Sequence, residues 1–137
     1  MINYFYENVN FSLQNEIFFT RWICFVVRNE DHDLDEINYT FCDDEYLLKM
    51  NQIYLDHDMY TDVITFDNSM GGGIVGDIFV SIERVAENSV QLTQNFQTEL
   101  KRVMIHGVLH LLGYKDKDEN EVRVMRKKED LYLNLLH

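Results

Sequence analysis

The chain has 137 residues, of which 24 are acidic and 12 basic, so its formal net charge is −12. Hydrophobic residues make up 46% and aromatic residues 13%, a composition that excludes an intrinsically disordered protein. A chain of this length is expected to fold as a single domain over residues 1–137. The longest nearly apolar run, Ile17–Val27, is far shorter than the ~20 residues that span a bilayer. We therefore expect no membrane partner.

The termini and cysteines point to a reduced compartment. The first ten residues lack the basic and apolar regions of a signal peptide. Cys24 and Cys42 form no CxxC motif, so neither a disulfide framework nor a zinc knuckle is predicted. We expect a cytoplasmic protein. Because the chain is strongly acidic, binding to RNA requires a local basic patch, a metal ion or a helper protein.

In chain order, the first elements predicted are a strand and a helix. Ile2–Tyr6 alternates aromatic and polar residues, which predicts a strand. Ser12 is a candidate N-cap for a helix that continues to about Arg28. We expect this helix to cover a sheet through Leu13, Ile17 and Ile23.

The remaining elements complete an α+β pattern. Ile37–Cys42 is rich in β-branched and aromatic residues, which predicts a strand. Asp43 and Asp44 then open a helix to about Tyr54, since early carboxylates suit the positive end of the helix dipole. Two further strands are expected at Val63–Phe66 and Ile74–Ser81. The rest of the chain is predicted to be helical, with breaks near Gln94-Asn95 and at Gly113. The order β-α-β-α-β-β-α-α-α predicts a small mixed four-stranded sheet packed with helices.

One short motif carries the chemistry. His106 and His110 are four residues apart on a predicted helix, so both rings lie on one face and can reach one ion. Gly113 suits a left-handed helix C-cap that turns the chain back, and Asp116 follows it. The pattern H-x-x-x-H-x-x-G-x-x-D has the spacing of the long zincin signature. It predicts one Zn²⁺ held by His106, His110 and Asp116. The alternative is a pair of core histidines that bond the backbone.

The residue after the first histidine argues against peptide hydrolysis. Zinc peptidases carry their glutamate general base at this position. Here it is Gly107. A metalloendopeptidase is therefore disfavoured, although the predicted helix geometry is shared.

Four blocks of the sequence resemble the YbeY family of bacterial endoribonucleases and ribosomal RNA maturation factors. HGVLHLLGY is similar to the family signature H-G-x-L-H-L-x-G-Y-D-H. Tyr54–Phe66 resembles Y-R-x-K-D-x-P-T-D-V-L-S-F, Gly76–Val85 resembles a G-D-I strand with its following helix, and Met125–Leu131 resembles an M-x-x-x-E stretch. The blocks occur in the family's order and cover nearly the whole chain.

The resemblance implies a metal-dependent single-strand endoribonuclease. Its role would lie in 3′-end maturation of small-subunit (16S) rRNA and in ribosome quality control, with rRNA and small-subunit proteins as partners and no small-molecule cofactor. His106, His110 and Asp116 would act through a metal-activated water. Thr61 and Asp62 begin the strand expected beside the cleft, and His57 lies in the loop before it.

Two departures from the family pattern keep a second hypothesis open. Asp116 stands where the family has histidine, and Leu55 stands where it has an arginine associated with activity. An arginine could clamp phosphate in a bidentate manner, whereas leucine cannot. The alternative is a ribosome assembly or quality-control factor that binds ribosomal components, with a structural metal and little nuclease activity.

The basic residues are distributed unevenly. Nine of the 12 lie between Arg84 and Lys128, so the metal-bearing end offers the best electrostatic match to RNA. Lys101 and Arg102 are the candidate substrate-binding residues of this region. The alternative is a set of solvated helix faces, because Glu99, Glu121 and Glu129 are interleaved.

Overall fold

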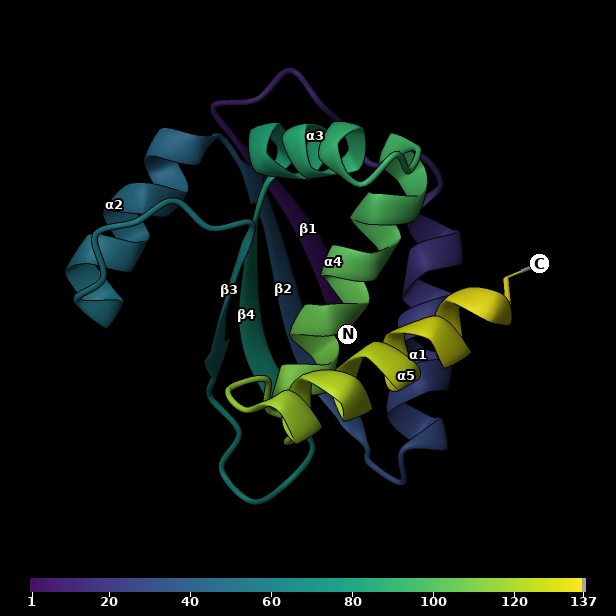
Figure 1. The fold of residues 1–137 in the computed structure, drawn as a ribbon. Helices are drawn as coiled ribbons and strands as arrows, with labels where there is room; N and C mark the ends of the chain where they lie inside the picture. Colours follow the sequence, from purple (N-terminus) through teal and green to yellow (C-terminus); the bar gives the residue numbers. More distant parts are fainter. Residues whose placement is uncertain (137) are drawn as a thin grey trace.

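A four-stranded mixed sheet forms the centre of the fold in the computed structural model, which describes residues 1–136 (Figure 1). The strands run in the order β1-β2-β4-β3. The strands β1 (Ile2–Glu7), β2 (Leu34–Cys42) and β4 (Ile74–Ser81) are parallel. The strand β3 (Val63–Asp67) pairs antiparallel with β4. The predicted α+β class, the mixed sheet and all four strands are confirmed.

The helix α1 (Glu16–Asn29) packs through one stripe of its surface. Its buried residues recur with the spacing of an amphipathic helix and face the sheet and α4: Phe19, Trp22, Ile23, Val26 and Val27. The indole N–H of Trp22 donates to the carbonyl of Tyr132, 3.2 Å away, which ties α1 to the last helix.

The start of α1 differs from the sequence prediction. Asn15, not Ser12, is the N-cap, and its side chain accepts a hydrogen bond from the N–H of Phe18. Ile17 is 67% exposed, so the prediction that it covers the sheet is wrong. Leu13 is buried but precedes the helix, and Ile23 is fully buried as predicted. Ile17 falls outside the stripe that Phe19 and Trp22 set.

The helix α4 (Phe96–Leu111) lies against the sheet and is covered by other helices (Figure 1). It contacts β3 and β4 on one side and α1, α3 (Ile82–Gln91) and α5 (Glu119–Asn134) around the rest of its circumference. Most of its residues are buried, as expected for a helix enclosed on several sides. The predicted breaks are confirmed, since α3 ends before Asn95, the N-cap of α4, and α4 ends before Gly113.

The opposite face of the sheet carries a smaller core. The helix α2 (Asp44–Leu55) begins at the N-cap Asp43, whose side chain accepts from the N–H of Tyr46. Leu47 of this helix packs with Cys42 and Ile64 from the sheet. Figure 1 shows α2 set apart from the other helices at the β3 edge. Within residues 1–136, no helix combines the length and apolar character needed to cross a membrane.

Candidate metal centre and its two cavities

The end of α4 turns the chain so that a third side chain meets the two histidines. Gly113 has a φ of 102°, a conformation that a side chain disfavours. Its N–H donates to the carbonyl of His110, and the N–H of Tyr114 donates to that of Leu109. This is the Schellman arrangement that ends a helix and reverses the chain. Asp116 then lies beside the helix face that carries both histidines.

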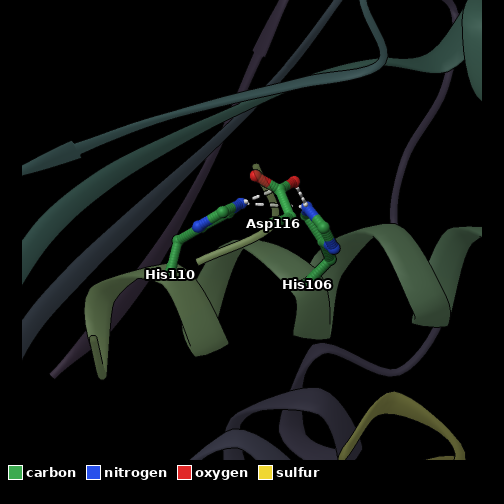
Figure 2. A group of neighbouring side chains, drawn as sticks. All are labelled: His106, His110 and Asp116. Carbon is green, nitrogen blue, oxygen red and sulfur yellow. Dashed lines mark hydrogen bonds and ion pairs between the residues drawn. The ribbon is translucent and has the colours of Figure 1, made fainter. Parts of the chain in front are cut away.

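The three candidate ligand atoms converge on one point (Figure 2). The Nε2 atoms of His106 and His110 are 3.0 Å apart. The Oδ2 of Asp116 lies 3.2 Å from the first of these atoms and 3.3 Å from the second. Tetrahedral Zn²⁺ with bonds near 2.0–2.1 Å places its ligands about 3.3 Å apart. The donor set and its spacing therefore fit a zinc ion with one position left open.

The outer nitrogen of each ring fixes its tautomer. Nδ1 of His106 lies 2.7 Å from Oε2 of Glu129, and Nδ1 of His110 lies 3.0 Å from the carbonyl oxygen of Tyr114. Both partners accept, so each Nδ1 carries a hydrogen, and a neutral ring in this tautomer presents its Nε2 lone pair to the other candidate ligands. Two such lone pairs and a carboxylate oxygen form a donor set that suits a cation between them.

The contact between His106 and Glu129 shifts the pKa values of both side chains. Burial is the largest single effect and lowers the pKa of His106, but the hydrogen bond to Glu129 and the negative charges of Glu129, Asp116 and Asp62 together outweigh it, so the pKa lies above the usual 6.5. Burial raises the pKa of Glu129, but the hydrogen bonds to His106 and Arg102 and the positive charges of His106 and Arg126 together outweigh it, and the net shift is downward. Arg102 donates to Glu129 at 2.8 Å. The three form a hydrogen-bonded network behind the first ligand, centred on the buried Glu129 carboxylate.

Gly107 faces the sheet rather than the candidate site. A Cβ at this position would lie 2.9 Å from Cγ2 of Ile78 and 3.3 Å from Cγ2 of Thr65. Only hydrogen fits there, because α4 lies directly on β3 and β4. The position that holds the base in zinc peptidases is therefore used here for helix-to-sheet packing.

Two cavities meet at the candidate ligands. The α5-side cavity has a volume of about 330 Å³ and the α2-side cavity one of about 300 Å³. Both are lined by Asp62, Val63, His106 and Asp116. Asp62, immediately before β3, accepts a hydrogen bond of 3.3 Å from the Asn88 side chain. Burial raises its pKa, against the opposing effect of His106.

The α5-side cavity brings together charged side chains from two helices, α4 and α5. Glu99, Arg102 and Arg126 line it, together with apolar side chains: Val63, Leu92, Val103, Val122 and Met125. Glu99 and Glu129 are each only 4% exposed. The interpretation of these glutamates as part of solvated helix faces is therefore wrong, since α4 and α5 enclose both.

The α2-side cavity holds the other predicted residues. His57 and Thr61 line it beside the two histidines, and Leu55 lies there as well. Within residues 1–136 its lining includes neither lysine nor arginine. The arginines near the candidate ligands are thus on the α5 side. Lys101 lies elsewhere, with Nζ 5.7 Å from the centre of the Phe18 ring on α1.

The sequence analysis did not identify the groups that accept hydrogen bonds from Nδ1 of His106 and of His110. Glu129 is the glutamate of the M-x-x-x-E stretch, and that block was the available signal. The backbone carbonyl of Tyr114 leaves no trace in a motif. The Tyr114 hydroxyl donates to Oε1 of Glu30 at 2.5 Å, which connects this turn to the end of α1. Glu30 has no sequence signal of its own.

The fold and the site define a small α+β protein with a zincin-like candidate metal centre on its central helix. The family described as endoribonuclease YbeY matches residues 3–137. A relative named endoribonuclease YbeY from Karelsulcia muelleri is 54% identical over 136 residues, covering 99% of this chain and 96% of that protein. The relative of the same name from Flavobacterium johnsoniae is 51% identical over 137 residues, covering 100% and 98%.

A solved structure shows the same architecture. The solution structure of a Thermotoga maritima protein superposes with a TM-score of 0.67 at 26% identity, covering 97% of this chain and 87% of the other. The chain belongs to the endoribonuclease YbeY family. The family expected from the four sequence blocks is confirmed.

Proposed function

We propose that this protein is a metal-dependent endoribonuclease that cleaves single-stranded RNA, with Zn²⁺ held by His106, His110 and Asp116. The family supports an RNA-hydrolysing enzyme, since its relatives are named endoribonucleases. The observation that carries the metal assignment is the convergence of two Nε2 atoms and one carboxylate oxygen at 3.0–3.3 Å. Two cavities meet at these residues and would give a substrate access to the ion.

The bound ion would supply a Lewis acid for a phosphoryl oxygen and a water activated at neutral pH. The chain's own residues support this chemistry. Glu129 and the Tyr114 carbonyl hold the two imidazoles in the tautomer that presents Nε2. Asp62 lines both cavities where they meet. Arg126, which lines the α5-side cavity with a side chain 57% exposed, would contact phosphate there.

The cellular role we propose is 3′-end maturation of 16S rRNA and ribosome quality control in the cytoplasm. The net charge of −12 supports a partner-assisted mechanism, because an acidic protein gains little affinity from phosphate contacts alone. Small-subunit ribosomal proteins, which are rich in basic residues, would provide that affinity. His57 and Thr61 in the α2-side cavity would contact RNA, and so would Arg102 in the other.

A second candidate function rests on Leu55. This residue lines the α2-side cavity, where the family pattern has an arginine that could clamp phosphate. A protein lacking that contact could act as a ribosome assembly factor whose metal stabilises the turn after α4. The arginines of the α5-side cavity favour the enzyme, because they offer phosphate contacts on the other side of the same ligands.

The test compares metal content and RNA cleavage. Protein loaded with zinc is offered rRNA alone and then with small ribosomal subunits. The enzyme predicts cleavage that is lost in His110→Ala and Asp116→Ala and retained in His32→Ala, an exposed histidine at the end of α1. Binding of all variants to the subunits without cleavage by any of them would support the assembly factor.

A further inference from the structure

The α5-side cavity contains a buried acidic group that the proposed metal chemistry does not use. Glu99 is 4% exposed and lines the cavity, and within residues 1–136 its carboxylate forms neither a hydrogen bond nor an ion pair. The carboxylate has little water around it and can accept hydrogen bonds from a ligand in the cavity. Burial accordingly raises its pKa, and the charge of Asp62 raises it further.

The walls around this carboxylate are suited to a flat aromatic ligand. Val103, Val122 and Met125 give apolar surface, and the Arg126 guanidinium lies at the rim. Apolar side chains and guanidinium planes both stack on nucleobases. The volume of about 330 Å³ lies at the small end of the range for ligand cavities, about 300–1,000 Å³. The cavity therefore has room for one base.

We infer that the α5-side cavity binds a guanine base of the RNA substrate, with the Glu99 carboxylate accepting hydrogen bonds from the guanine N1–H and N2–H₂ groups. This specificity rests on the proposed endoribonuclease function. The cavity shares His106 and Asp116 with the candidate metal centre, so a base held there places a neighbouring phosphate at the ligands.

The chemistry of the four bases selects guanine. Its Watson–Crick edge carries two adjacent donors that match the two oxygens of a carboxylate. Adenine and cytosine offer one amino donor next to a ring acceptor, which faces the second carboxylate oxygen unfavourably. Uracil offers one imino donor between two carbonyl oxygens, both of which repel the carboxylate. A site built on buried acceptors rejects a ligand that lacks the donors.

The decisive comparison is between guanosine and inosine monophosphates, which differ only by the N2 amino group. Isotope-labelled, zinc-loaded protein is titrated with each, and amide shifts of Val103 and Val122 report occupancy of the cavity. We expect guanosine monophosphate to bind about ten-fold more tightly, as for the loss of one hydrogen bond to a charged group. In Glu99→Gln the difference should vanish, while the matched surface variant Glu119→Gln should keep it.

Cleavage gives a second and separate readout. In single-stranded RNAs that contain one guanosine, wild-type protein should cut beside it, and replacement by inosine should slow the cut by a similar factor. Equal affinities for the two monophosphates in the wild-type protein would overturn the guanine assignment, as would a preference that survives in Glu99→Gln. Guanosine-specific binding without cleavage of any RNA would sustain the cavity assignment and contradict the proposed nuclease.

Discussion

Nδ1 of His106 on α4 donates a 2.7 Å hydrogen bond to Oε2 of Glu129 on α5, although 23 residues separate the two in sequence. Glu129 is buried, and its other oxygen accepts from Arg102 at 2.8 Å. The carboxylate thus holds one candidate ligand in its metal-binding tautomer while the arginine balances its charge. The last helix is therefore part of the candidate metal centre, although it contributes no ligand.

Removing this carboxylate should weaken metal binding. We expect Glu129→Ala to lower zinc affinity by about 10–100-fold, the usual effect of losing a group that orients a ligating histidine. Asp130→Ala is the matched control, because Asp130 also accepts from Arg102 at 2.8 Å but contacts neither histidine. Competition against a chromophoric chelator measures both affinities. Equal affinities in the two variants would contradict the positioning role of Glu129.

A second series of hydrogen bonds connects His110, through Tyr114, to Glu30 at the end of α1. Glu30 accepts hydrogen bonds from the hydroxyls of Tyr114 and Tyr132, and the carbonyl of Tyr114 accepts from His110. We expect Tyr114→Phe to lower zinc affinity about five-fold, equivalent to losing roughly 1 kcal/mol of restraint on that carbonyl. Tyr132→Phe removes the other hydroxyl bound to Glu30 and should leave zinc affinity unchanged. Calorimetric titration with zinc distinguishes the two variants.

The ligand motif was predictable because its signals are local. Two histidines four residues apart share a helix face in any helix, and Gly113 ends α4 through its own backbone conformation. The start of α1 was predicted wrongly at Ser12, because Asn15, three residues later, also has a side chain that can cap a helix. The structure uses Asn15, and the buried stripe leaves Ile17 in solvent.

The role of the glutamates could not be predicted from the same signals. In the sequence, Glu99 and Glu129 look like ordinary charges on amphipathic helices. They are buried because α5 crosses the face of α4 that carries His106, and that crossing depends on packing of the whole chain. Gly107 is similar, since its close approach to Ile78 is set by the sheet and not by its own helix.

Placing the peptidase glutamate at position 107 should damage the fold without creating a peptidase. A side chain there meets Ile78 and Thr65, so Gly107→Glu both overpacks the sheet and buries an unpaired charge. We expect the free energy of unfolding to fall by at least about 3 kcal/mol. Gly72→Glu is the control, because a Cβ at Gly72 meets nothing within 4 Å. Denaturant unfolding measures both, and near-equal stabilities would contradict the close packing of α4 on the sheet.

The metal-free and zinc-loaded proteins should respond to pH in opposite directions. The pKa of His106 is raised above 6.5 in the folded protein because the hydrogen bond to Glu129 and the charges of Glu129, Asp116 and Asp62 together outweigh burial. A raised folded-state pKa contributes stability that is fully present below the unfolded value and is lost as pH rises through the folded one. In chelator, the melting temperature should therefore fall as pH rises from about 6.5 through the folded pKa. With zinc present it should rise over the same window, because deprotonated His106 binds the ion.

Glu129→Gln provides the control for this pH effect. It removes the negative charge that raises the pKa of His106 and leaves an amide oxygen that can still accept from Nδ1. In chelator, the decline in melting temperature with rising pH should therefore become shallower than in the unmodified protein. The measurement is differential scanning calorimetry in matched buffers from about pH 6 to about pH 8, with and without zinc. A metal-free protein whose melting temperature rises with pH across this range would contradict the raised pKa of His106 in the folded protein.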